Sequence, residues 1–85
     1  MGIELTAYSI GDVPEYLAEE GLEQAQYYFD INDLEPQDCF EASEQNPRST
    51  FGQHWSTACL KANLILKGNR LYDNSLICLE IDIPA

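Results

Sequence analysis

Apolar and polar residues alternate at both ends of the chain. In residues 3–10 the apolar side is formed by Ile3, Leu5 and Ala7, and the polar side by Glu4, Thr6 and Tyr8. In residues 75–83 the apolar side is formed by Ile77, Leu79, Ile81 and Ile83, and the other side by Cys78, Glu80 and Asp82. Alternation with a period of two residues is typical of a strand that buries one face. The sequence therefore predicts a small sheet built from an N-terminal and a C-terminal strand.

The first segment between these strands has apolar residues at helical spacing. Asp12 and Glu15 form a capping-box-like pair, and Pro14 falls in the first turn, where its missing N–H costs nothing. We expect a helix over residues 13–29. Its apolar face consists of Leu17, Ala18, Gly21, Leu22, Ala25, Tyr28 and Phe29.

A second segment with helical spacing begins at Thr50, which forms another capping-box-like pair with Gln53. Its apolar residues are Phe51, Trp55, Ala58, Cys59, Ala62, Ile65 and Leu66. Gly68 is a typical C-terminal stop, so we expect a helix over residues 50–67. A strand over residues 62–67 is the alternative, because β-branched and alternating residues fit either element.

The middle segment, residues 30–47, is polar and contains two prolines. We expect an ordered loop there, with a helical turn over residues 38–43. A loop of this length in so small a domain is often functional. Together with the strands and helices, it predicts one α+β domain over residues 1–85, in which two helices cover the small sheet.

Charge is sorted along the chain. The net charge is −11, from 15 acidic and 4 basic residues. Residues 1–47 hold 12 of the acids and no base, residues 48–72 hold all four bases, and residues 73–85 hold the other three acids. Contact with nucleic-acid phosphates or anionic lipid needs clustered Lys and Arg, so this balance argues against direct nucleic-acid or membrane binding. We expect a cytoplasmic protein, because no apolar run reaches membrane-spanning length and the N-terminus lacks a signal-peptide pattern.

The acids of the first half form the candidate binding surface. On the predicted helix, Glu15, Glu19 and Glu23 fall on one stripe with Glu20 nearby. Tyrosine beside carboxylates suits the binding of Arg-rich surfaces, and we expect Tyr16 or Tyr27 to be exposed. The candidate partner-binding residues are Glu15, Tyr16, Glu19, Glu20, Glu23, Tyr27, Asp30, Asp33, Glu35 and Asp38, and Glu41 and Glu44 extend the acidic segment.

Residue types that could carry chemistry are sparse and widely spaced. His54 is the only histidine, and Cys59, five residues later, points to another face of a helix. Cys39, Cys59 and Cys78 lie too far apart for a Cys-x-x-Cys knuckle, and we expect isolated core thiols. Residues 30–41 miss two defining positions of the EF-hand template. We therefore expect no cofactor, no bound metal and no enzymatic activity.

These features favour a non-enzymatic binding protein that occludes the cationic, nucleic-acid-binding site of a partner such as a nuclease. Its size and charge are similar to those of small acidic inhibitors encoded by phages and mobile elements, and of immunity proteins against nuclease toxins. DNA mimicry would need further acids beside the helical stripe, which places a charge every ~6 Å where one DNA strand has one every ~3.4 Å. The alternatives are a self-associating domain, dimerising through Phe51, Trp55 and Leu60, and a small thiol- or metal-dependent enzyme.

Overall fold

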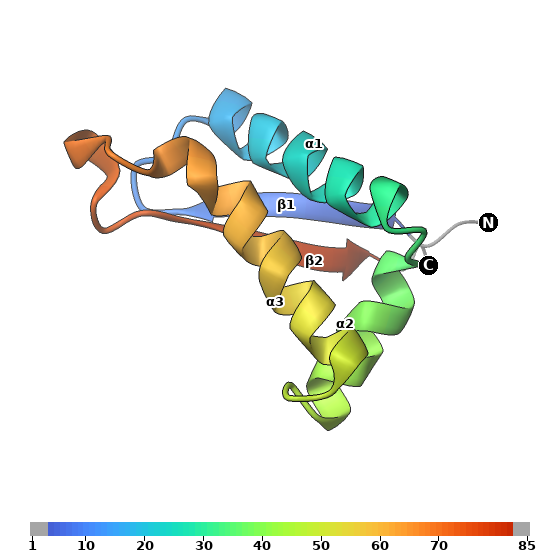
Figure 1. The fold of residues 1–85 in the computed structure, drawn as a ribbon. Helices are drawn as coiled ribbons and strands as arrows, with labels where there is room; N and C mark the ends of the chain where they lie inside the picture. The colour runs from blue at the N-terminus through green and yellow to red at the C-terminus, as the bar shows by residue number, and fades with distance from the viewer. Residues whose placement is uncertain (1–3, 83–85) are drawn as a thin grey trace.

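The computed structural model describes residues 4–82, which fold into a small α+β domain (Figure 1). Its strands and α-helices are β1 (Glu4–Ile10), α1 (Glu15–Ile31), α2 (Pro36–Gln45), α3 (Thr50–Asn63) and β2 (Leu76–Asp82). Two short 3-10 turns, Leu64–Leu66 and Arg70–Tyr72, connect α3 to β2. The predicted α+β class and the sheet formed by the two ends of the chain are confirmed.

The sheet consists of β1 and β2 in antiparallel pairing, with Leu5 opposite Ile81 and Ser9 opposite Ile77. Helices α1 and α3 cover one face of it (Figure 1). Leu5, Ile77 and Leu79 are buried, as the alternation predicts, whereas Glu4, Glu80 and Asp82 are exposed. Ile3 and Ile83, which the sequence places on the apolar faces, lie outside the described residues.

The core lies between the sheet and the helices. Phe29 of α1, Cys39 of α2 and Ile77 of β2 are its largest fully buried side chains. Helix α1 approaches α3 closely at Gly21, where a Cβ atom would lie 2.7 Å from the carbonyl oxygen of Ala62. Only a residue without a side chain permits this approach, so the glycine determines the distance between the two helices.

Helix α1 begins and ends two residues later than predicted. Pro14 is its N-cap and no side-chain cap hydrogen bond forms, so the predicted pairing of Asp12 with Glu15 is wrong. At the other end, Asp33 has a φ of 54° and the N–H of Leu34 donates to the carbonyl oxygen of Phe29 at 2.9 Å. This is a Schellman ending, in which aspartate takes the left-handed position that glycine usually occupies.

The prediction of a loop over residues 30–47 is wrong, because most of this segment is helix α2. Pro36 occupies the first turn, where a proline is tolerated, and Asp38 lies near the positive end of the helix dipole. The helix buries Cys39 and places Phe40 against Trp55 of α3, with ring centroids 5.1 Å apart. A single buried position gave too little apolar periodicity to identify this helix from sequence.

Helix α3 is shorter than predicted and has a different cap. Ser49, not Thr50, is the N-cap, and its Oγ accepts a hydrogen bond from the N–H of Gly52 at 3.1 Å. The helix ends at Asn63 and is followed by a 3-10 turn, so the alternative of a strand over residues 62–67 is also wrong. Gly68, with a φ of 81°, ends that turn rather than the helix.

Candidate protein-binding surface

Every Asp and Glu side chain of the protein is on the surface. All fifteen Asp and Glu residues fall within residues 4–82, and each is exposed. Among these described residues no polar or charged side chain is buried. Burial therefore does not neutralise the negative charge, which remains accessible to a partner in solution.

The acidic stripe of α1 lies on the side of this helix that faces away from α3. Tyr28 and Gly21 mark the opposite side, since Tyr28 contacts His54 of α3 and Gly21 approaches the α3 backbone. At 3.6 residues per turn, another side is shared by Glu15, Glu19, Glu23, Gln26 and Asp30. The helix thus separates a side that packs on α3 from a side rich in carboxylates.

This acidic side of α1 lies beside strand β1. Glu15 lines a surface hollow of about 410 Å³ together with residues 7–9 of β1. Gln26 and Asp30 line a second hollow, of about 440 Å³, together with Glu4 and Leu5 of β1. The two ends of the stripe, at Glu15 and Asp30, therefore lie beside β1, a relation that the sequence pattern did not reveal.

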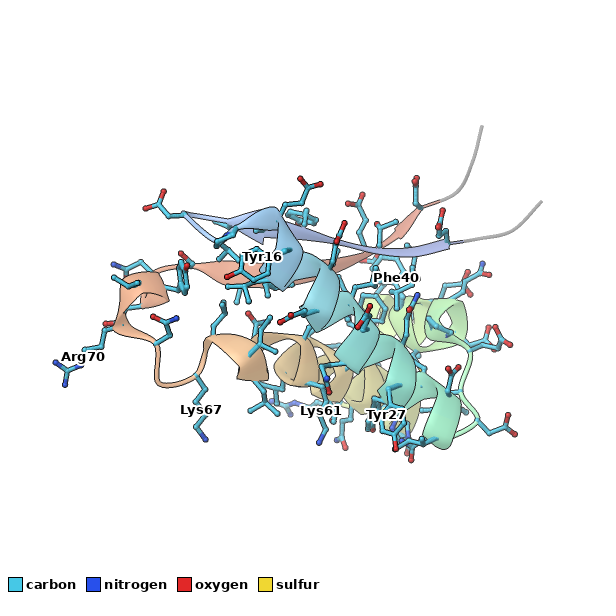
Figure 2. All side chains as sticks on the ribbon, turned by 90° about the horizontal axis from the view of Figure 1, so that it is seen from above. Tyr16, Tyr27, Phe40, Lys61, Lys67 and Arg70 are labelled. Carbon is cyan, nitrogen blue, oxygen red and sulfur yellow. The ribbon has the colours of Figure 1, made fainter. Side chains whose placement is uncertain are left out.

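Both tyrosines singled out from the sequence are exposed, as predicted. Tyr16 is 61% exposed and Tyr27 is 63% exposed. They are three helical turns apart, about 16 Å along the axis, and so point to the same side, together with Glu20. Figure 2 shows them toward the two ends of α1. Their rings are accessible for stacking against arginine side chains.

The remaining candidate acids continue the acidic surface beyond the end of α1. Asp33 lies in the turn after α1, Glu35 is the N-cap of α2, and Asp38 lies in the first turn of α2. Helix α2 packs on α3 and extends away from α1 (Figure 1), carrying Glu41 and Glu44 with it. These acids therefore do not lie alongside the α1 stripe, which imitation of a DNA strand would require.

The basic residues lie elsewhere. Figure 2 shows Lys61, Lys67 and Arg70 on the side of the molecule opposite β1. Arg48 is in the turn between α2 and α3. Lys61 nevertheless lies near Tyr27, because both line a surface hollow of about 250 Å³. The bases are therefore separated from β1, but not from every candidate binding residue.

His54 belongs to an aromatic cluster between the three helices. Its Nδ1 atom forms a 2.7 Å hydrogen bond with the hydroxyl of Tyr28. Beside it, Trp55 contacts Phe29 and Phe40, with ring centroids 6.1 Å and 5.1 Å away. These contacts account for the partly buried histidine as a structural residue that joins α1 to α3.

The three cysteines are free thiols, and Cys39 is fully buried. Burial raises the pKa of the Cys39 thiol, and the nearby Asp38 carboxylate adds to the shift. Burial also raises the pKa of Cys59, although a hydrogen bond from the N–H of Leu79 opposes this. Since the thiolate is the nucleophile and the metal ligand, a raised pKa makes both thiols less reactive.

Within residues 4–82, His, Cys, Asp and Glu side chains do not gather in groups of three or more that could hold a metal ion. In the same range, none of the helices has the length and apolar character needed to cross a bilayer.

The apolar face proposed for self-association is only partly exposed. Phe51 is 52% exposed and Leu60 is 68% exposed, whereas Trp55 is partly buried in the aromatic cluster. Trp55 and Leu60 also line an apolar hollow of about 410 Å³ with Leu76 of β2. Dimerisation through this face stays a prediction.

Comparison of the chain with protein-family models, curated proteins and solved structures finds no match.

Proposed function

We propose that this protein binds a cationic surface of another protein through the acidic side of α1 and thereby blocks nucleic-acid binding at that surface. The observation that carries the proposal is the exposure of all fifteen carboxylates, with the bases Lys61, Lys67 and Arg70 on the opposite side from β1. An excess of exposed negative charge attracts a basic partner and repels anionic ones.

The stability of the helix argues against a purely passive role for these charges. Glu15, Glu19 and Glu23 repel one another at four-residue steps, and like charges at this spacing destabilise a helix by a few tenths of a kcal/mol per pair. Solubility alone is achieved with both signs interspersed, without this penalty. An acidic stripe that costs helix stability thus fits a binding surface better than a surface that serves solubility alone.

The proposed mode is occlusion of the partner's cationic site, not a copy of a DNA strand. The stripe on α1 spaces its charges by about 6 Å, and α2 does not supply a second row beside it. Tyr16 and Tyr27 contribute accessible rings next to the carboxylates, which suits arginine more than a bare phosphate-like row would.

The proposal is tested with a triple charge reversal, Glu15→Lys, Glu19→Lys and Glu23→Lys. The matched control reverses Glu41, Glu44 and Asp73, which changes the net charge equally but leaves α1 intact. Wild-type protein used as bait should capture basic nucleic-acid-binding proteins at about 50 mM salt and lose them at about 500 mM, where the Debye length is only a few ångströms. The α1 variant should lose the same proteins at low salt, and the control should retain them.

A second measurement addresses occlusion. The captured protein is purified, and its binding to a fluorescent DNA duplex is followed by anisotropy while the acidic protein is added. Competition supports the proposal. Simultaneous binding of both ligands, or capture that survives reversal of the α1 stripe, contradicts it.

A further inference from the structure

The backbone of β1 has an unpaired edge. The sheet of the described residues contains only β1 and β2, so each strand has one edge without a neighbouring strand. Asn63 of α3 donates to the carbonyl oxygen of Ile77 at 2.7 Å and accepts from its N–H at 2.8 Å, so these groups of Ile77 point away from β1. In an antiparallel pair, two residues directly opposite each other point their backbone N–H and C=O groups either toward each other or both away from the partner strand. The N–H and C=O of Ser9, which is opposite Ile77, therefore also point away from the partner strand. Because this orientation repeats every second residue, the backbone N–H and C=O groups of Leu5, Ala7 and Ser9 point outward from the free edge of β1.

The fold treats its two sheet edges differently. On β2, Asn63 satisfies both backbone groups of Ile77. Along β1, by contrast, the structure has the two hollows of about 410 Å³ and 440 Å³, walled by α1. One edge is therefore closed by α3, while the other borders open space.

We propose that β1 accepts an extended, Lys- or Arg-bearing segment of the partner protein as a third strand. This inference rests on the proposed function, because the acidic side of α1 that attracts the partner reaches β1 at Glu15 and Asp30. Main-chain hydrogen bonds to an exposed sheet edge are a common mode of peptide recognition, with side chains at alternate positions giving specificity.

The dimensions of the acidic stripe fit a strand. From Glu15 to Asp30 the stripe extends about 22 Å, and the seven residues of β1 extend about 23 Å. Glu15, Glu19 and Glu23 follow at steps of about 6 Å, while side chains on one face of a strand follow at about 6.6 Å. Basic residues at every second position, on the side of the added strand that faces α1, would thus each meet a carboxylate.

A second copy of this chain is the wrong occupant for this edge. Two copies joined through β1 would bring their α1 stripes together, and each copy carries a net charge of −11. Like charges facing each other across an interface oppose association. Charged side chains beside a sheet edge are a recognised protection against pairing with identical chains.

The test uses two peptides of equal charge. One is an acetylated peptide of four Lys-Val repeats, and the other has proline in place of each valine, which cannot form a paired strand. Nuclear magnetic resonance of the wild-type protein should show slowed exchange of the Leu5, Ala7 and Ser9 amides with the first peptide only. Binding of the proline peptide should be about tenfold weaker, because only charge attraction remains. Equal affinity for the two peptides, or unchanged exchange at these three amides, overturns strand addition.

Variants separate the backbone from the charge. Ala7→Pro removes an outward N–H without removing a hydrogen bond to β2, whereas Ala7→Ser keeps this N–H. The proline variant should bind the Lys-Val peptide about tenfold more weakly, and the serine variant should bind it as the wild type does. The triple reversal of Glu15, Glu19 and Glu23 should lower the affinity for both peptides about tenfold, because each exposed ion pair contributes a factor of about two.

The outcomes distinguish the two proposals. If the triple reversal weakens binding but Ala7→Pro does not, strand addition is wrong and the acidic binding surface stands. If the reversal changes neither peptide's affinity, both proposals fail. Sedimentation of the wild type as a dimer that Ala7→Pro converts to a monomer would show that a second copy occupies the edge, and would also overturn the inference.

Discussion

Replacing Asn63 by alanine should uncover the edge of β2 and destabilise the protein. The side chain makes three hydrogen bonds: two with the backbone of Ile77, at 2.7 Å and 2.8 Å, and one to the carbonyl oxygen of Cys59, at 2.9 Å. A hydrogen bond contributes about 1 kcal/mol net, and partly buried groups left without a partner lose more than exposed ones. We therefore expect Asn63→Ala to lower the free energy of unfolding by about 2–4 kcal/mol.

Urea denaturation followed by far-ultraviolet circular dichroism measures this loss. The matched control is Asn32→Ala, which removes one exposed hydrogen bond, from Nδ2 to the carbonyl oxygen of Tyr28 at 2.8 Å. The control should lose less than about 1 kcal/mol, because Asn32 is the C-cap of α1 and its single side-chain bond is exposed. In a domain of this size the Asn63 variant should melt roughly 10–25 °C lower. Equal losses in the two variants would refute the argument that Asn63 stabilises the β2 edge.

The other expectations concern repulsion, packing and titration. Glu19→Lys replaces repulsion by attraction toward the acids one turn before and after it, so it should raise the free energy of unfolding by about 1 kcal/mol in urea denaturation at low salt, and a decrease would contradict the repulsion. Gly21→Ala places a Cβ 2.7 Å from the carbonyl oxygen of Ala62. The cost of overpacking, about 1–3 kcal/mol, should exceed the gain in helix propensity of about 1 kcal/mol, so the melting temperature should fall. A higher melting temperature would show that α1 can shift freely. Burial raises the pKa values of Cys39 and Cys59, so the folded state retains these protons longer than the unfolded state. The contribution of these protonated thiols to the free energy of unfolding is complete below the usual thiol pKa and decreases as the pH rises above it. Denaturation across the alkaline range measures this decrease in the wild type. A Cys39→Ala, Cys59→Ala control should lack it.

Local pattern was sufficient for the strands and for two of the helices. The period-two alternation identified β1 and β2 because each buries one face, and the 3.6-residue period identified α1 and α3 because each packs a broad apolar face. The exposure of Tyr16 and Tyr27 followed from their positions opposite the apolar face of α1. Where a segment's own residues determine its burial, sequence reasoning succeeded.

Helix α2 shows where this reasoning failed. Its single buried residue, Cys39, gives no periodic signal, and Pro36 resembles a loop marker although it is suited to a first turn. The helix is stabilised by contact with α3, including that of Phe40 with Trp55, and residues distant in sequence provide this contact. Most helices of this length depend on such packing, because isolated short helices are marginal in water.

The sequence by itself determined the charge of this protein, its division into an acidic half and a basic segment, and the amphipathic elements that carry these charges. Only the tertiary structure decided which side of α1 faces α3, and that Glu15 and Asp30, at the two ends of the stripe, lie beside β1. It also decided that α3 closes the edge of β2 through Asn63, whereas the edge of β1 borders open hollows. The reason is physical: side-chain pattern reports whether a residue prefers water, but the partner of a backbone edge depends on which distant element packs against it.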